Sequence, residues 1–270
     1  REKDLVGTLR RLSALDGLEG QAPDLRREAK GLAENVLKDD ALAEAILRDM
    51  LKSDENDAWA LSELTKLREK ADDFKEVFSL LVRQAELAAE ADKVRELRHA
   101  AAQVAREKLS NNAKAIELYD AIFEDDPSDK RASDALRDLY SKGNKHKELL
   151  KLLSRLIDLA ETPEARNALR LESAQICLEK LNVIGEATDH LRAVLDEDPR
   201  NADATKLLAS LLEKTGRDKE LAELFDSQIE LAKDRGDVQT ELAYSVRLGE
   251  VYETRLNNVP KAIETYKAVL

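Results

Sequence analysis

Three histidines and one cysteine are the side chains of this sequence best suited to catalysis or to binding a transition metal. His99, His146 and His190 are widely separated, and none lies within one helical turn of another histidine or of Cys177. A zinc site or a Cys–His nucleophile would therefore need side chains brought together from different helices. No glycine-rich phosphate-binding motif occurs. We expect a protein that is not an enzyme and that binds no metal or nucleotide cofactor.

Each of these residues also has a simpler, structural interpretation. His99 and His190 occupy positions where related segments of the chain carry Leu, and Cys177 aligns with an alanine. We expect them in or beside a hydrophobic core, with Cys177 as a buried small side chain rather than a reactive thiol. The acidic clusters at 124–126 and 196–198 lack the D-x-D-x-D-G pattern of a calcium loop, so we expect solvated helix ends there.

Composition favours helices and argues against several kinds of partner. The 270 residues carry a formal charge of −12, which disfavours nucleic acid and favours a basic protein partner. Aromatic residues are only 4% of the chain, and Gly and Pro are scarce, so helix is favoured over strand. A single cysteine provides no disulfide framework, and no apolar run is long enough to insert into a membrane. We expect a cytoplasmic location, unless a signal sequence preceded Arg1.

The elements that must position these side chains recur every 72 residues. K-D-L at 3–5 is followed by K-E-V at 75–77 and by K-E-L at 147–149 and 219–221. Each triplet is followed by apolar residues at i+3 and i+4, which is the stripe of an amphipathic helix. The triplet therefore predicts a helix start, with the acidic residue favoured by the helix N-terminus and the apolar residue as the first core contact.

Three further helices repeat in the same register, so each block contains four. The last step lengthens to 75 residues because a loop near residue 235 is longer. Pro127 and Pro199 follow predicted helix ends, and Thr162 before a proline predicts an N-cap. Gly143 and Gly216 lie between helices, where a positive φ is often required.

Half of a 72-residue block is a hairpin of about 36 residues, close to the ~34 of a tetratricopeptide repeat (TPR). Segment 209–225 resembles that family in its spacing of Ala209, Gly216 and Phe225, and segment 249–266 resembles it too. The resemblance implies an all-α fold, a right-handed α-solenoid of about seven TPR-like hairpins with a 72-residue double repeat and a concave groove. The alternating hairpins look like those of large bacterial scaffolding proteins.

The repeat pattern covers the whole chain, and this determines the expected domain organisation and function. We expect residues 1–270 to form one continuous solenoid, and, because the pattern runs to both ends, to be a segment of a longer chain. The leading hypothesis is a scaffold that presents its groove to a peptide or helix of a protein partner. The alternative is a regulatory or assembly segment that docks on another domain of its own longer chain.

Trp59 is the most informative residue for a partner site. Its position carries Arg131 and Asp203 in later copies, so it belongs to a face that the resemblance turns toward the groove. It is either a partner contact or a staple against a neighbouring side chain. A Lys-x-x-x-Asn carboxylate clamp is missing at the matching positions, which disfavours a receptor for chaperone tails. The predicted groove residues are Trp59, Ser62, Lys66, Glu69, His99, Gln103, Arg106, Arg131, Asp134 and Asp138.

Overall fold

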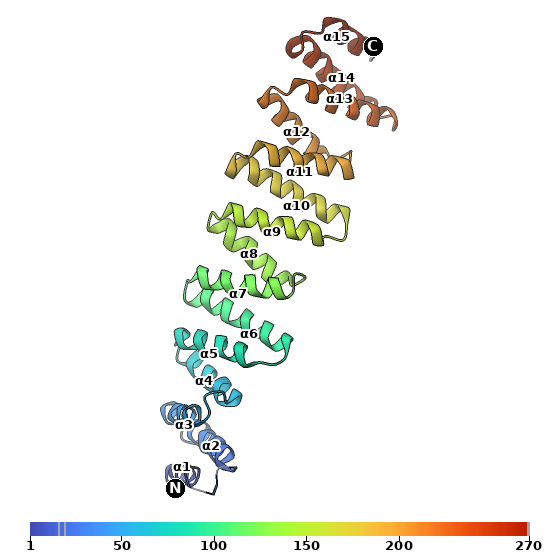
Figure 1. Cartoon of the computed structure of the whole chain (residues 1–270). Coiled ribbons are helices and arrows are strands. Elements are labelled where there is room, and N and C mark those ends of the chain that lie inside the picture. The colour runs from blue at the N-terminus through green and yellow to red at the C-terminus, as the bar shows by residue number, and fades with distance from the viewer. Residues whose placement is uncertain (16, 19, 269–270) are drawn as a thin grey trace. The chain divides into compact units, whose positions relative to one another are not determined.

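The computed structural model describes residues 1–15, 17–18 and 20–268, and every regular element in these ranges is helical (Figure 1). The all-α class predicted from the sequence is confirmed. The described residues form 15 α-helices: α1 (Glu2–Leu12), α2 (Ala22–Gly31), α3 (Asp40–Ser53), α4 (Ala58–Lys70), α5 (Phe74–Leu87), α6 (Ala91–Gln103), α7 (Asn112–Asp125), α8 (Lys130–Lys142), α9 (His146–Leu159), α10 (Pro163–Ile176), α11 (Ile184–Glu197), α12 (Ala202–Thr215), α13 (Asp218–Lys233), α14 (Val238–Glu250) and α15 (Val259–Lys267).

Four of these helices continue into a wider, π-helical last turn. The turns follow α2, α6, α10 and α14, and they are η1 (Leu32–Val36), η2 (Val104–Lys108), η3 (Cys177–Leu181) and η4 (Val251–Arg255). Their backbone N–H groups bond five residues back, as Leu109 N does to Val104 O at 3.1 Å. Each turn ends at a residue of left-handed conformation: Lys38, Ser110, Asn182 or Asn257. Every second hairpin therefore begins with a helix that ends in the same way.

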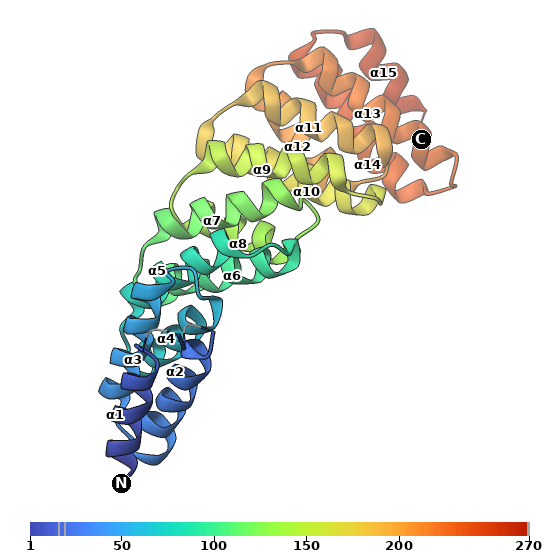
Figure 2. The same ribbon diagram turned by 60° about the horizontal axis from the view of Figure 1, so that its bottom comes forward.

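The chain divides into two compact units, residues 1–139 and 140–270, and the division falls inside α8. In each unit, consecutive helices run back and forth as antiparallel hairpins (Figures 1 and 2). The pairs α2–α3, α4–α5 and α6–α7 lie in the first unit. The pairs α10–α11, α12–α13 and α14–α15 lie in the second. This pairing in sequence order confirms the hairpin arrangement expected from the repeat.

The apolar stripes meet in a core that runs through successive hairpins of each unit. In the first unit Ile46, Leu47, Leu61 and Leu64 are almost completely buried in one cluster. In the second unit the corresponding cluster contains Leu191, Leu212, Leu221 and Phe225. Because neighbouring hairpins share each cluster, no hairpin buries its stripe alone.

The K-E-L triplets lie in the first turns of the odd-numbered helices, as predicted. Val77, Leu149 and Leu221 are buried, whereas Leu5 in the first copy is 44% exposed. The acidic residue also makes a contact that the sequence did not reveal. Arg48 of α3 donates to Glu76 of α5 at 2.8 Å, and Arg192 of α11 pairs with Glu220 of α13. The acidic residue of the triplet thus ties one odd-numbered helix to the next.

Most of the predicted helix boundaries are confirmed, and one is corrected. Thr162 accepts a hydrogen bond from the backbone N–H of Ala165 at 3.2 Å and caps α10. Gly216 ends α12 with a φ of 66°. The positive φ after α8 belongs to Asn144, at 54°, and not to Gly143 as expected. Asparagine is the non-glycine residue that best tolerates this conformation, so it can replace glycine at the turn.

Candidate functional site

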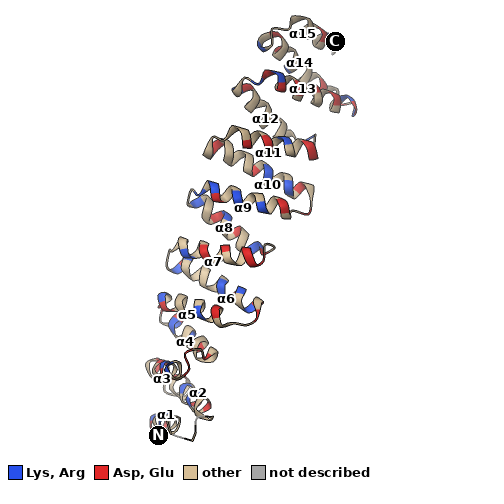
Figure 3. Cartoon of the chain, viewed as in Figure 1, with Lys and Arg blue, Asp and Glu red and all other residues tan. Residues whose placement is uncertain are grey.

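The predicted groove residues all lie on three even-numbered helices of the first unit. Trp59, Ser62, Lys66 and Glu69 are on α4, His99 and Gln103 on α6, Arg106 on η2, and Arg131, Asp134 and Asp138 on α8. Charged residues of both signs occur on most helices in view (Figure 3). The even-numbered helices are the first helices of the hairpins, so the predicted residues do share one kind of element. Their exposure and partners differ, and they divide into three groups.

Trp59 lies between α2 and α4, and it is half-buried. Its ring packs against the core cluster of the first unit. On the α2 side, the guanidinium carbon of Arg27 lies 5.2 Å and Nζ of Lys30 lies 5.9 Å from the ring centroid. Both distances are within the range of a cation–π contact. The ring therefore links two successive first helices, and only part of its surface faces solvent.

A charge cluster lies beside Trp59 and involves the predicted residue Lys66. Lys30 Nζ is 2.5 Å from carboxylate oxygens of both Glu34 and Glu63, and Lys66 Nζ is 2.5 Å from the other oxygen of Glu63. Burial alone would lower the pKa of Lys30, but the bonds to the two carboxylates raise it. Burial would raise the pKa of Glu63, but the bonds from Lys30 and Lys66 lower it. These groups stay charged, and the cluster fixes α2 against α4.

A groove of about 510 Å³ runs between α4 and α6, and Ser62 is the predicted residue that lines it. Its apolar floor includes Leu61, Leu97 and Leu87, and Leu87 is 40% exposed. The remaining lining residues come from α4, the end of α5, the α5–α6 loop and α6, and they are Ala58, Gln84, Ala88, Ala89, Glu90 and Lys93. This is the one place where predicted residues and an apolar concavity coincide in the part of the chain that the structure describes.

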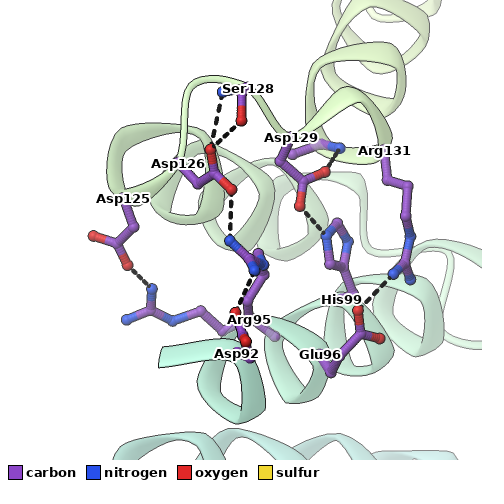
Figure 4. Close-up of polar contacts among 11 residues, drawn as sticks. Asp92, Arg95, Glu96, His99, Asp125, Asp126, Ser128, Asp129 and Arg131 are labelled. Atoms are coloured by element: carbon purple, nitrogen blue, oxygen red, sulfur yellow. Dashed lines mark hydrogen bonds and ion pairs between the residues drawn. The ribbon is translucent and has the colours of Figure 1, made fainter. Parts of the chain in front are cut away.

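His99 is buried and does not offer its side chain to a partner. It is 3% exposed, and its Nε2 lies 2.8 Å from Oδ2 of Asp129 at the start of α8 (Figure 4). The His99 ring also contacts Tyr119 of α7, with centroids 5.9 Å apart. Burial would raise the pKa of Asp129, but the hydrogen bonds from His99 and from the backbone of Ala132 hold it below its usual value. His99 therefore joins three helices, in agreement with the interpretation of a packed histidine.

The remaining predicted residues form surface contacts between α6 and α8. Arg131 Nη1 is 2.8 Å from Oε1 of Glu96, and Arg106 Nη2 is 2.6 Å from Oδ2 of Asp138. Exposed pairs of this kind contribute little stability, so their surfaces remain usable by a partner. Glu69, Gln103 and Asp134 are exposed on the same helices.

Arginine residues of α6 hold the end of α7, and the sequence did not reveal these contacts. Arg95 Nη1 lies 2.5 Å from Oδ2 of Asp126, and Arg98 pairs with Asp125 (Figure 4). In the second unit Arg166 and Arg170 both bond to Glu197 at the end of α11. The signal was present as basic residues recurring on the first helices, opposite the acidic helix ends that were expected to be solvated.

The described residues contain no metal-binding group of three or more histidine, cysteine or acidic side chains. Cys177 is fully buried, and burial together with the nearby Glu186 raises its pKa to about 11. None of the described helices has the length and apolar character needed to cross a membrane.

Comparisons with known proteins identify the repeat. Residues 204–239, which include α12 and α13, match the family model of the tetratricopeptide repeat. No curated protein matches the chain. A chain in the structure of Naa15/Naa10 bound to HypK-THB is similar with a TM-score of 0.50 and 15% identity, over 96% of this chain and 42% of that one. This chain thus spans less than half of that relative.

Two other solved structures are similar at lower TM-scores. A tetratricopeptide repeat protein from Parabacteroides merdae matches with a TM-score of 0.39 and 12% identity, over 91% of this chain and 99% of that one. YrrB, described as a TPR protein with an unusual peptide-binding site, matches with a TM-score of 0.36 and 18% identity, over 73% and 96%. At these identities the likeness concerns the fold, which is that of stacked TPR hairpins.

Proposed function

We propose that the chain is a non-enzymatic scaffold for protein–protein interaction and that the groove between α4 and α6 holds a peptide segment of the partner. The observation that carries the proposal is the exposed Leu87 above an apolar floor, with polar side chains at the edges. Such a mixture of apolar floor and few polar groups suits a bulky apolar side chain on a peptide whose backbone bonds at the edge.

The charge of the chain favours a basic partner. The formal charge is −12, and Glu90 and Lys93 at the groove carry opposite signs. The groove edge therefore has no net preference, and the overall field steers basic segments toward the surface. The expected ligand is a short segment with one large apolar residue flanked by Lys or Arg, and its association should slow as salt is added.

Selection of ligands from a library of short random peptides tests this proposal. Leu87→Asp should weaken the selected peptides about tenfold or more, which corresponds to ~1.4 kcal/mol, because it places a charge in the apolar floor. The free energy of unfolding should change little, since Leu87 is exposed. Val36→Asp is the matched control, because Val36 is 55% exposed and does not line this groove.

Two results would contradict the proposal. Equal loss of binding in both variants would show that charge on the surface matters and the groove does not. Selected peptides that bind Leu87→Asp as tightly as the original chain would place the partner site elsewhere.

A further inference from the structure

Exposed apolar side chains are concentrated on the last two described helices. Five of the eleven exposed large apolar residues of the described chain lie on α14 and α15. Val238, Leu242 and Val246 are spaced four residues apart on α14, with 69%, 46% and 40% exposure, and therefore form one stripe. Val259 and Ile263 are exposed on α15, at 54% and 47%. A patch of this kind on a soluble chain indicates an interaction site.

The 72-residue spacing shows what these positions contact in earlier blocks. The position of Val246 is held by Arg27 in the first block and by His99 in the second. Arg27 lies over the ring of Trp59 near the start of α4, and His99 bonds to Asp129 at the start of α8. The position of Leu242 is held by Arg95, which bonds to Asp126 in the turn before α8. In both blocks this face of the helix meets the beginning of the next even-numbered helix.

The exposed positions of α15 correspond in the same way to contacts with the next odd-numbered helix. Lys267 holds the position of Arg48 and Arg192. Those two arginines pair with Glu76 and Glu220, the acidic residues of the K-E-V and K-E-L triplets. Ile263 corresponds to Thr188, which is 2% exposed and accepts a hydrogen bond from Arg217 in the turn before α13. Lys267 makes no ion pair with any residue that the structure describes.

We infer that the face formed by Leu242, Val246, Ile263 and Lys267 docks an amphipathic helical hairpin. The first helix of this hairpin carries a bulky apolar residue near its N-terminus, because Leu242 and Val246 replace the charged residues of earlier blocks with apolar ones. The second helix begins with Glu or Asp followed by Leu, so that its carboxylate meets Lys267 and its Leu meets Ile263. This face shares no residue with the groove between α4 and α6.

An extended chain tests the inference directly. A copy of residues 52–87 is joined after Leu270, which holds the same repeat position as Leu51, so the register is kept. The copied segment brings the equivalents of Trp59 and Glu76 to the positions opposite Val246 and Lys267. Amide hydrogen exchange of α14, α15 and the added segment should slow at least about tenfold relative to the unextended chain and to the free segment.

Matched variants separate docking from a general effect of the extension. Val246→Asp should remove most of the added protection in the extended chain and change the unextended chain little, because Val246 is 40% exposed there. Lys267→Glu should reduce the protection in part, and should do so most at low salt. A copy of residues 124–159 has the same length but carries Arg131 at the position of Trp59, so it should protect less.

Three outcomes would overturn the inference. One is exchange of both added segments at the rate of an unfolded chain. Another is full protection of the extended chain in the presence of Val246→Asp, which would show that the stripe is not the contact. The last is protection of α14 and α15 in the unextended chain that rises with protein concentration, which would assign the face to a second copy of the chain.

Discussion

Trp59 and His99 show how a residue that suggests function can instead join helices. Trp59 lies under Arg27 and Lys30, and His99 bonds to Asp129, so each connects an even-numbered helix to the next. Both were predicted as lining residues of a groove. The structure leaves part of the Trp59 ring accessible but buries His99 almost completely.

Replacing Trp59 should affect stability more than peptide binding in the α4–α6 groove. Trp59→Leu keeps an apolar side chain but removes the contact with Arg27 and Lys30, and it should lower the free energy of unfolding by about 1 kcal/mol. Trp59→Phe keeps a ring and should cost less. Urea denaturation followed by circular dichroism measures both variants. Unchanged stability with lost binding would identify Trp59 as a partner contact instead.

Asp129→Asn should make stability less dependent on acid. Asparagine can still accept the backbone N–H of Ala132 as an N-cap, so the change mainly removes the charge that His99 contacts. The folded-state pKa of Asp129 is lowered, so its contribution is present above the unfolded value near 4 and is lost as pH falls through the folded value. At pH 7 the variant should be less stable by ~1–2 kcal/mol.

Chemical denaturation of both proteins at pH 7 and at pH 3 checks this prediction. The difference between the original chain and Asp129→Asn should shrink at the lower pH, where the carboxylate becomes protonated. A difference that stays constant between the two pH values would mean that packing, and not charge, underlies the effect.

The sequence predicted residue environments better than residue pairs. Cys177 and His99 were expected in packed positions because apolar residues replace them in sister copies, and both are buried. The ion pairs were missed because 44 basic and 56 acidic residues allow many combinations, and only the packing of helices selects among them. Leu87 was missed for a related reason, since the end of a helix stripe does not show whether a neighbour covers it.

At the scale of the helix, the two kinds of helix end follow the 72-residue spacing closely. Asp72, Asn144 and Gly216 have positive φ after α4, α8 and α12, and each is 72 residues from the next. Lys38, Ser110 and Asn182 have positive φ after the π-helical turns at the same spacing. The sequence predicted the turns from glycine and missed most of these positions, because only one of the six is a glycine.

Substitutions at two of these positions should have opposite effects. Lys38→Gly should stabilise the protein by about 1 kcal/mol, because glycine adopts a φ of 53° without the strain of a Cβ atom. Gly216→Ala should destabilise it by a similar amount, ~1 kcal/mol, for the converse reason. A Cβ at Gly216 would have no other atom within 4 Å, so backbone conformation alone is tested.

Thermal and urea unfolding of the two variants provide the measurement. Loss of stability in Lys38→Gly would show that the contacts of the lysine side chain outweigh the strain. A neutral Gly216→Ala would show that the turn after α12 relaxes to another conformation.

At the scale of the whole molecule, the question is how far a local change spreads. Phe225 is fully buried in the second unit, where Tyr244 and Arg247 of α14 contact its ring. Phe225→Ala should cost ~3–5 kcal/mol. Contacts in a stack of hairpins are local, so the effect should be largest in the neighbouring hairpins.

Two natural probes report on the two units separately. Trp59, the only tryptophan, reports on the first unit by fluorescence. Cys177 belongs to the same cluster as Phe225, and its raised pKa and burial keep the thiol unreactive until that region opens. In Phe225→Ala, labelling of Cys177 should accelerate while the fluorescence transition of Trp59 shifts much less. Equal shifts of both probes would show that the chain unfolds as one cooperative whole.

The alternation of helix ends restricts how such a chain can change length during evolution. Helices that end in a π-helical turn, such as α6 and α10, are separated by one that ends in an ordinary turn, such as α8. Duplication or deletion of one hairpin by recombination would place two helices with the same kind of end in succession. Duplication of two hairpins would restore every neighbour. Descendants of a common ancestor should therefore differ in length by whole pairs of hairpins, so that the heritable building block is twice the size of the structural one.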